Sequence, residues 1–157
     1  MKKLFLTLLL STLISVTFGQ TSSMKTISFR LKPGDDLREG IEKVVQQQKI
    51  QAGTLLSAVG SLTTASIRFA NQPEATTLNG HFEIVSITGT VSTNGSHIHI
   101  SVSNETGKTV GGHLAAGNKI YTTAEIIMGI LPDLSFQREV DPTFGYKELV
   151  IKPAKGN

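Results

Sequence analysis

The sequence contains no cysteine and no tryptophan, and aromatic residues make up only 6% of its 157 positions. A chain without cysteine cannot form a disulfide framework, a Cys-ligated zinc or iron–sulfur site, or a thiol-based active site. Any metal centre must therefore use nitrogen or oxygen ligands. An apolar fraction of 39% with 17% charged residues is typical of a globular protein rather than a disordered one.

Several familiar motifs are also missing. No G-x-S-x-G, P-loop, G-x-G-x-x-G or H-E-x-x-H pattern occurs, so the sequence gives no sign of the hydrolase, nucleotide or zinc-protease sites that these motifs build. The formal net charge is +3, and nowhere do four Lys or Arg residues follow one another. Charge runs therefore do not indicate a surface for nucleic acid.

The N-terminal segment has the three-part layout of a secretory signal peptide. Residues 1–3 are basic at two positions, residues 4–16 form an uncharged apolar run, and the small residues Thr17 and Gly19 follow. A transmembrane anchor is one alternative, but a run of about 13 residues is shorter than the roughly 20 that span a bilayer. A buried core helix is another, although the run lacks helical amphipathicity. We expect cleavage near Gly19, no stable membrane anchor, and a periplasmic or secreted protein.

Removal of residues 1–19 changes the charge balance. Lys2 and Lys3 leave with the segment, so that the mature chain has 13 basic and 12 acidic residues. An almost neutral chain lacks the excess positive charge on which non-specific binding to phosphate backbones depends. We therefore do not expect nucleic acid to be a partner.

The remaining chain is predicted to form one α+β domain, a mostly antiparallel β-sheet with one main helix packed on it. Residues 20–24 are expected to be a disordered N-terminus, residues 25–151 the domain, and residues 152–157 a tail. Alternating or β-branched runs between Gly, Asn and Pro turns predict strands at residues 25–31, 54–59, 65–70, 81–92, 96–103, 109–114, 119–128, 134–140 and 147–151.

A single helix is predicted over residues 36–48. Asp36 and Glu39 have the spacing of a capping box, in which the first side chain accepts backbone N–H bonds and the second reaches back. Behind them Leu37, Ile41 and Val45 recur at helical spacing and define the buried face.

Three of the four histidines lie on two strands that a short turn joins. His97 and His99 alternate with apolar neighbours, so both rings point to one face of their strand. The segment 104–107, Asn-Glu-Thr-Gly, fits a type I turn followed by a glycine in the left-handed region. This turn pairs Asn104 with Lys108 and brings His99 opposite His113.

The same register pairs Val102 with Val110, and Ile98 with Leu114, on the other face, which supports the assignment of the turn. Opposed Cβ atoms lie about 5 Å apart and diagonal neighbours about 7–8 Å apart. Three imidazoles in such a triangle can converge on one divalent metal ion at about 2.0–2.1 Å.

Zn²⁺ suits three histidines with an open fourth position, and Ni²⁺, Cu²⁺ and Fe²⁺ remain open. The glycines at 111 and 112 would leave space above this site. The alternative is a solvated polar strand face with no metal.

Other charged residues are weaker candidates. Glu83 and Glu125 stand among apolar strand residues and could act as a general base, although an exposed strand position explains them equally. Arg30 and Arg68 could bind an anion, although surface arginine is the usual case. His81 starts a strand and is expected to be structural or exposed.

Taken together, the motifs resemble those of the PPC domain (plants and prokaryotes conserved). The resemblance covers about residues 25–151 and rests on an ordered set of segments: Arg30–Leu37, Ala58–Leu62, Gly80–Gly89, His97–Val102, Gly111–Leu114 and the pair Ala124-Glu125. It implies an α+β fold, a homotrimer, and in prokaryotic members a metal held by the H-x-H and G-G-H positions, here His97, His99 and His113.

Two departures bear on function. Plant relatives are nuclear proteins in which a separate R-G-R-P AT-hook grips the DNA minor groove. This chain has no R-G-R-P core, and it carries the export pattern described above. The resulting hypothesis is an exported homotrimeric domain that binds a divalent metal through three histidines, with Zn²⁺ as the expected ion and room for a small-molecule ligand. A DNA-binding protein and a metal-dependent enzyme of unknown substrate are the alternatives.

Overall fold

The computed structural model describes residues 19–154, so the predicted signal peptide lies outside the described residues except for Gly19. Within that range no helix is both long and apolar enough to cross a bilayer. Along the chain the elements are β1 (Lys25–Leu31), α1 (Leu37–Gln47), β2 (Gly53–Arg68), β3 (Thr76–Ser92), β4 (Gly95–Ser103), β5 (Thr109–Leu114), β6 (Lys119–Ile130), β7 (Leu134–Val140) and β8 (Lys147–Pro153).

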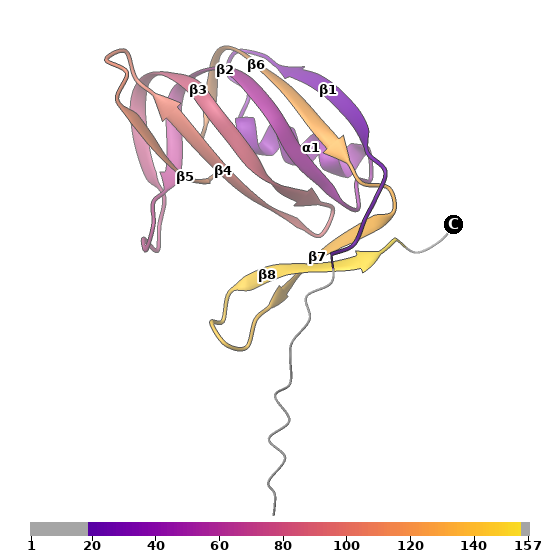
Figure 1. Cartoon of the computed structure of the whole chain (residues 1–157). Helices are drawn as coiled ribbons and strands as arrows, with labels where there is room; N and C mark the ends of the chain where they lie inside the picture. The colour runs from indigo at the N-terminus through magenta and orange to yellow at the C-terminus, as the bar shows by residue number, and fades with distance from the viewer. Residues whose placement is uncertain (1–18, 155–157) are drawn as a thin grey trace, which may run out of the picture.

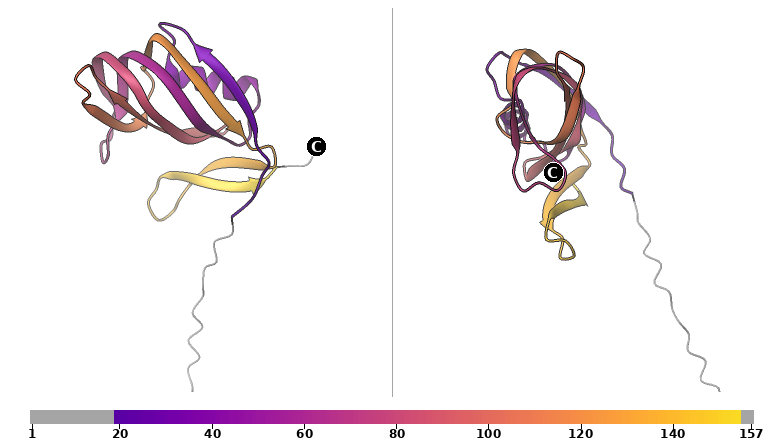
Figure 2. Two further views of the ribbon diagram at one scale, coloured as in Figure 1. Left: turned by 45° about the horizontal axis from the view of Figure 1, so that its top comes forward. Right: turned by 90° about the vertical axis from the view of Figure 1, so that its left-hand side faces the viewer.

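The strands confirm the predicted α+β class with an antiparallel sheet. Six of them form one sheet in the order β1-β6-β2-β3-β4-β5, and a further pairing between β2 and β5 closes β2 to β5 into a ring. This closure gives the barrel that Figure 2 shows end-on in its right-hand view. The strands β7 and β8 form a separate hairpin that projects from one end of the barrel (Figure 1).

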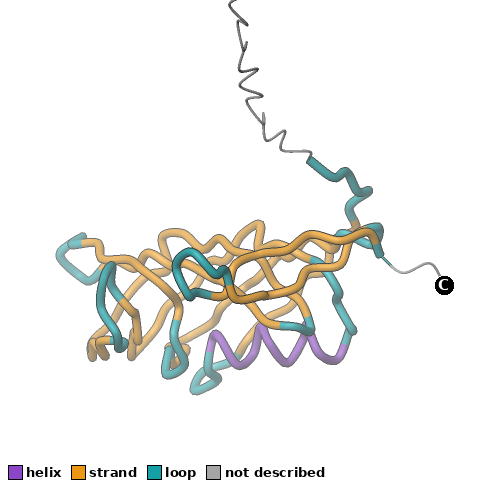
Figure 3. The backbone as a smooth tube through the Cα atoms, turned by 90° about the horizontal axis from the view of Figure 1, so that it is seen from below, coloured by secondary structure: helices purple, strands orange, loops and turns teal. Residues whose placement is uncertain are grey.

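The core fills the inside of the barrel. Inward positions alternate along each strand, as in β4, where Ile98, Ile100 and Val102 are buried between more exposed residues. The helix α1 lies along one side of the strands (Figure 3) and buries Leu37, Ile41 and Val45 against them.

The helix begins where the capping residue predicts. Asp36 is the N-cap, and its carboxylate accepts the backbone N–H groups of Arg38 at 3.0 Å and Glu39 at 3.1 Å. The return bond from the Glu39 carboxylate, which a full capping box would add, is not among the contacts of the described residues. Asp36 also accepts a third bond, from the N–H of Gly117 at 2.7 Å, which ties the helix start to the loop before β6.

Two strand boundaries differ from the prediction. The segments 54–59 and 65–70 are one long strand, β2, because Gly60 does not turn the chain. It allows a close approach to β6 instead, since a Cβ added there would lie 2.0 Å from the carbonyl oxygen of Thr123. The strand β3 begins at Thr76 rather than His81, since its first residues pair with the second half of β2.

The ends of the domain also differ in detail. Lys152 and Pro153, predicted to be tail, pair with Ser135 and Leu134 in the β7–β8 hairpin. Residues 20–24 form no helix or strand, and the Ser23 N–H and hydroxyl both donate to the Asp133 carboxylate at 2.9 Å.

Candidate metal centre and adjoining cavity

The β4–β5 hairpin has the predicted turn. Asn104 N–H donates to the Lys108 carbonyl at 3.1 Å, Gly107 N–H donates to the Asn104 carbonyl at 2.9 Å, and Gly107 has a φ of +79°. The Asn104 side chain also accepts the N–H groups of Thr106 and Lys108. The hairpin register follows from this turn and pairs His99 with His113.

The three predicted histidines converge through named ring nitrogens. Nε2 of His97 and Nε2 of His99 each lie 3.1 Å from Nδ1 of His113. One nitrogen from each ring lies within 4.8 Å of the other two. The rings of His97 and His113 stack with centroids 4.9 Å apart, and the ring of His99 stands edge-on to that of His113.

Hydrogen bonding alone explains this convergence poorly. A ring nitrogen carries either one proton or one lone pair, so Nδ1 of His113 can make one strong hydrogen bond to its two neighbours, not two. A divalent cation accepts one lone pair from each ring. Two nitrogens at 2.0–2.1 Å from a tetrahedral ion lie about 3.3–3.4 Å apart, close to the observed 3.1 Å. The donor set therefore fits a metal ion bound by three neutral imidazoles.

The surroundings keep two of these rings neutral. Desolvation, together with the nearby charges of Arg68 and the other two histidines, lowers the pKa of His113 from 6.5 to about 4. Desolvation also lowers the pKa of His97, with Arg138 as the next cause. Protons therefore do not compete for these ring nitrogens near neutral pH, which is the state a metal requires.

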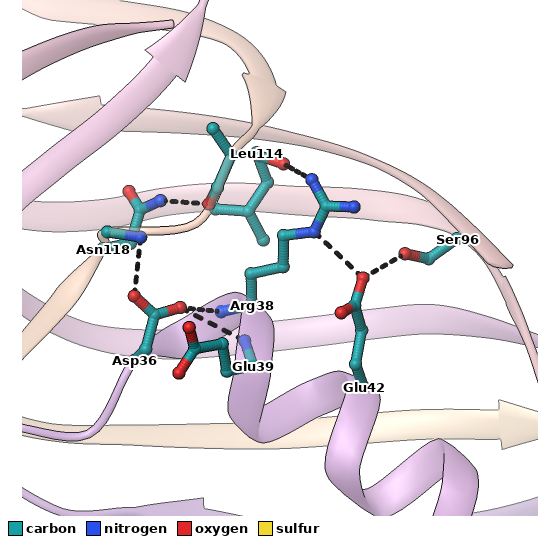
Figure 4. A network of polar contacts seen from close by, with 9 residues as sticks. Asp36, Arg38, Glu39, Glu42, Ser96, Leu114 and Asn118 are labelled. Atoms are coloured by element: carbon teal, nitrogen blue, oxygen red, sulfur yellow. Dashed lines mark hydrogen bonds and ion pairs between the residues drawn. The ribbon is translucent and has the colours of Figure 1, made fainter.

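A polar network on α1 fixes the ends of the two strands that carry the histidines (Figure 4). Arg38 donates to the Leu114 carbonyl at 3.1 Å, next to His113 in the chain, and to the Glu42 carboxylate at 2.9 Å. The same Glu42 oxygen accepts the hydroxyl of Ser96 at 2.9 Å, next to His97. The helix thus connects both strands at the histidine cluster.

Glycine packing brings β5 close to β2 at the same place. A Cβ added to Gly112 would lie 2.5 Å from the Arg68 carbonyl oxygen, so only glycine allows this approach. The pairing that results sets Arg68 directly opposite His113.

A cavity of about 1080 Å³ opens beside the cluster and includes His97 and His113 in its walls. Arg68, one of the two arginines considered as anion ligands, lines it, whereas Arg30 lies on β1 and donates to the Thr123 hydroxyl at 2.8 Å.

The two candidate bases are placed elsewhere. Glu83 is exposed on β3 opposite Ser103, and Glu125 is exposed on β6 between Arg30 and Val59. Neither is among the residues that line the cavity. His81 is exposed and stacks on Tyr121 with ring centroids 4.4 Å apart, in line with the expected structural or exposed role.

Two residues of the cavity had no signal in the sequence. Arg138 and Lys147 lie on the β7–β8 hairpin and reach the cavity only because this hairpin packs against the β3–β4 turn. Arg138 N–H donates to the Asn94 side chain at 2.7 Å, which fixes that contact. The two neighbouring strand patterns near the C-terminus could have indicated a hairpin. They could not have indicated where this hairpin docks.

Several known proteins are similar to this chain in sequence and fold. The bifunctional protein GlmU of a Synechococcus strain is 44% identical over 135 residues, which are 86% of this chain and only 21% of that protein. A solved hypothetical protein from Salmonella enterica is 35% identical with a TM-score of 0.85, and the match covers 87% of this chain and 99% of that one. A solved metal-containing protein from Archaeoglobus fulgidus is 25% identical with a TM-score of 0.70, covering 84% and 99%.

The family assignment rests on the sequence match. The family model described as the Plants and Prokaryotes Conserved (PCC) domain matches residues 18–132, which contain all three histidines of the cluster and the whole barrel. The chain therefore belongs to the Plants and Prokaryotes Conserved domain family, the family that its motifs resemble.

Proposed function

We propose that the mature protein is an exported, homotrimeric metal-binding domain in which His97, His99 and His113 hold one divalent cation, with Zn²⁺ as the preferred ion. The observation that carries the proposal is the convergence of two Nε2 atoms on one Nδ1 atom, each at 3.1 Å. When bound, the cation supplies a Lewis-acidic centre with room for a further ligand, since three protein ligands leave a tetrahedral position free.

The donor chemistry supports zinc, or another transition metal, over calcium and magnesium. All three donors are imidazole nitrogens, and within residues 19–154 the cluster includes no carboxylate. Imidazole suits zinc, copper, nickel and iron, whereas calcium and magnesium prefer oxygen ligands. A similar solved structure is described as a metal-containing protein, which agrees with a metal at this fold.

Metal titration tests the site directly. The purified mature protein is stripped with a chelator and titrated with Zn²⁺ against a chromophoric competitor, and Co²⁺ absorption reports the coordination geometry. We expect one ion per chain in the wild type and in the control His81→Ala, since His81 lies outside the cluster. Loss of a residue that only hydrogen-bonds to a metal ligand typically weakens metal affinity by roughly 10–100-fold. His99→Ala and His113→Ala remove ligands themselves, so each should weaken Zn²⁺ binding by more than that.

The result that would refute the site is equally plain. A wild-type chain that binds no Zn²⁺, Ni²⁺, Cu²⁺ or Fe²⁺ above the level of His99→Ala would leave the three histidines as a polar strand face. Circular dichroism of each variant separates loss of a ligand from loss of the fold.

An apolar patch on the outside of the barrel supports assembly into a homotrimer. Val59 is 62% exposed and Val85 57% exposed, and the register that pairs Leu55 with Gly89 places these two valines opposite each other. Ile127 on β6 is exposed beside them. Contiguous exposed apolar side chains on a sheet face usually mark a surface that another chain covers.

Light scattering after size exclusion tests the assembly. We expect a mass three times that of one mature chain, and a shift towards monomer in Val59→Asp, whereas the exposed polar control Thr88→Asp should keep the wild-type mass. A monomeric wild-type protein would refute the trimer without affecting the metal site.

The signal-peptide pattern of residues 1–19 supports export. Expression of the full chain in a Gram-negative host, followed by intact-mass measurement of the periplasmic fraction, should give a protein that begins at Gln20. Full-length protein in the cytoplasm would refute export.

A further inference from the structure

The cavity beside the histidine cluster has walls from four parts of the chain. The barrel contributes β4, β5 and the end of β2, the helix contributes Arg38, the loop before β3 contributes Asn71 and Gln72, and the β7–β8 hairpin forms the remaining wall. Its volume of about 1080 Å³ is just above the range of about 300–1,000 Å³ that is usual for small-molecule sites. The size therefore suits a metabolite rather than a single ion.

The charges in these walls are mostly positive. Arg38, Arg68, Arg138 and Lys147 line the cavity, and Glu148 is the one acidic residue among its lining residues. Arg38 is paired with Glu42 at 2.9 Å. Within residues 19–154, neither Arg68 nor Arg138 has a carboxylate within 4.0 Å, so their charges are not neutralised by an ion pair.

These two arginines line the cavity together with His97 and His113. Arg68 is the cross-strand partner of His113, which places their Cβ atoms about 5 Å apart on one face. Its guanidinium donates to the Gln72 carbonyl at 3.2 Å, which directs it along the cavity wall. A guanidinium held by one backbone carbonyl still has donors free for a ligand.

Arg138 approaches from the hairpin. Its backbone N–H is fixed by Asn94 at 2.7 Å, and its guanidinium donates to the Lys147 carbonyl across the hairpin. Its side chain lines the cavity together with His97. The two cations therefore reach one cavity from different elements, Arg68 from β2 of the barrel and Arg138 from β7 of the hairpin.

We propose that this cavity binds a small organic anion, whose carboxylate or phosphate group is held by Arg68 and Arg138 next to the histidine cluster. The planar guanidinium group matches both kinds of oxyanion in a bidentate geometry. The statement that the anion lies against a metal rests on the proposed function, whereas the role of the two arginines does not. A duplex nucleic acid fits less well, because the positive groups line a cavity rather than an extended surface.

Calorimetry on the mature protein tests the proposal. Inorganic phosphate, malonate and a short DNA duplex are titrated separately into the zinc-loaded and the metal-free protein. The variants are Arg68→Gln and Arg138→Gln, and the matched control is Arg30→Gln, an arginine of β1 that bonds Thr123 away from the cavity. The zinc content of each protein is measured in parallel.

We expect phosphate or malonate to bind, and the better of the two identifies the oxyanion. Each cavity variant should weaken that binding by roughly tenfold or more, as loss of a charge-assisted hydrogen bond implies, while Arg30→Gln and the zinc content stay unchanged. A wild-type protein that binds neither small anion, or variants that bind as the wild type does, would overturn the proposal. Binding of the duplex alone, lost in both variants, would overturn it in favour of a nucleic-acid groove.

The zinc measurement keeps the two proposals apart. Arginine-dependent anion binding in a protein that takes up no zinc refutes the metal centre and supports the cavity. Zinc uptake with no arginine-dependent anion binding refutes the cavity and supports the metal centre.

Discussion

Asn118 is the buried polar residue whose loss should cost the most. The side chain is 0% exposed, accepts the N–H of Ser66 at 2.9 Å, and donates to the carbonyls of Ser66 at 3.0 Å and Ala115 at 2.7 Å. These bonds join β2 to the loop after β5. Ser66 lies two residues before Arg68, and Ala115 lies two residues after His113. Asn118 therefore supports the position of the candidate site as well as the barrel.

The expected magnitude for Asn118→Ala follows from the groups left without partners. The Ser66 carbonyl keeps a bond from Ala115 N–H at 3.1 Å, but the Ser66 N–H and the Ala115 carbonyl lose the partner that Asn118 provides. A buried unsatisfied group costs about 1–3 kcal/mol, so two of them lower the free energy of unfolding by about 2–6 kcal/mol. Asn118→Asp keeps the acceptor but turns a buried carboxylate oxygen towards the carbonyls of Ser66 and Ala115, so it should lose at least as much.

Urea unfolding followed by circular dichroism, at one protein concentration, measures this loss. Asn79→Ala is the control, because Asn79 is exposed on β3 and should change stability by less than about 0.5 kcal/mol. The reasoning would be refuted if Asn118→Ala lowered the free energy of unfolding by less than about 1 kcal/mol while the slope of that free energy against urea concentration stayed unchanged. These buried hydrogen bonds would then contribute less to stability than expected.

Three further outcomes are expected. The metal-free protein should lose about 1–2 kcal/mol of stability as the pH falls from about 6.5 to 4, because the unfolded chain binds a proton at His113 that the folded chain, with its lowered pKa, does not bind. Subtracting the profile of His113→Gln isolates this loss, and identical profiles would contradict it. Gly112→Ala should lower the free energy of unfolding by about 1–3 kcal/mol and weaken zinc binding, since its Cβ would lie 2.5 Å from the Arg68 carbonyl oxygen. Wild-type values in both assays would show that β2 and β5 can move apart without cost. Gly107→Ala should cost about 1 kcal/mol because of its φ of +79°, measured by thermal unfolding beside the exposed neighbour Glu105→Ala, and equal melting temperatures would rule the strain out.

The histidine cluster was predictable because its geometry is local. The turn residues Asn104 and Gly107 set the hairpin register, and the register sets which side chains face each other. Strand alternation then places His97, His99 and His113 on one face. No contact between distant parts of the chain is needed for this inference.

The closure of the barrel and the cavity could not be predicted in this way. Glycine is common in turns, so Gly60 suggests a turn from the sequence alone. Only its contact with Thr123 on β6 shows that the chain continues as one strand. Arg138 lines the same cavity as His97 only because a hairpin about forty residues later docks there, where Arg138 N–H bonds Asn94. Pairings between distant segments depend on packing that no local pattern records.

The position of the β7–β8 hairpin has a consequence for how this domain can diversify. The family model ends at residue 132, just before the hairpin begins at Leu134, so it includes the three clustered histidines but not the hairpin wall of the cavity. Leu134 and Phe136 seat the hairpin on Ala52 through a small apolar cluster of its own, separate from the barrel core. Exchange of the outer hairpin residues should therefore change which anion the proposed cavity site binds, while the histidine cluster and the barrel stay as they are.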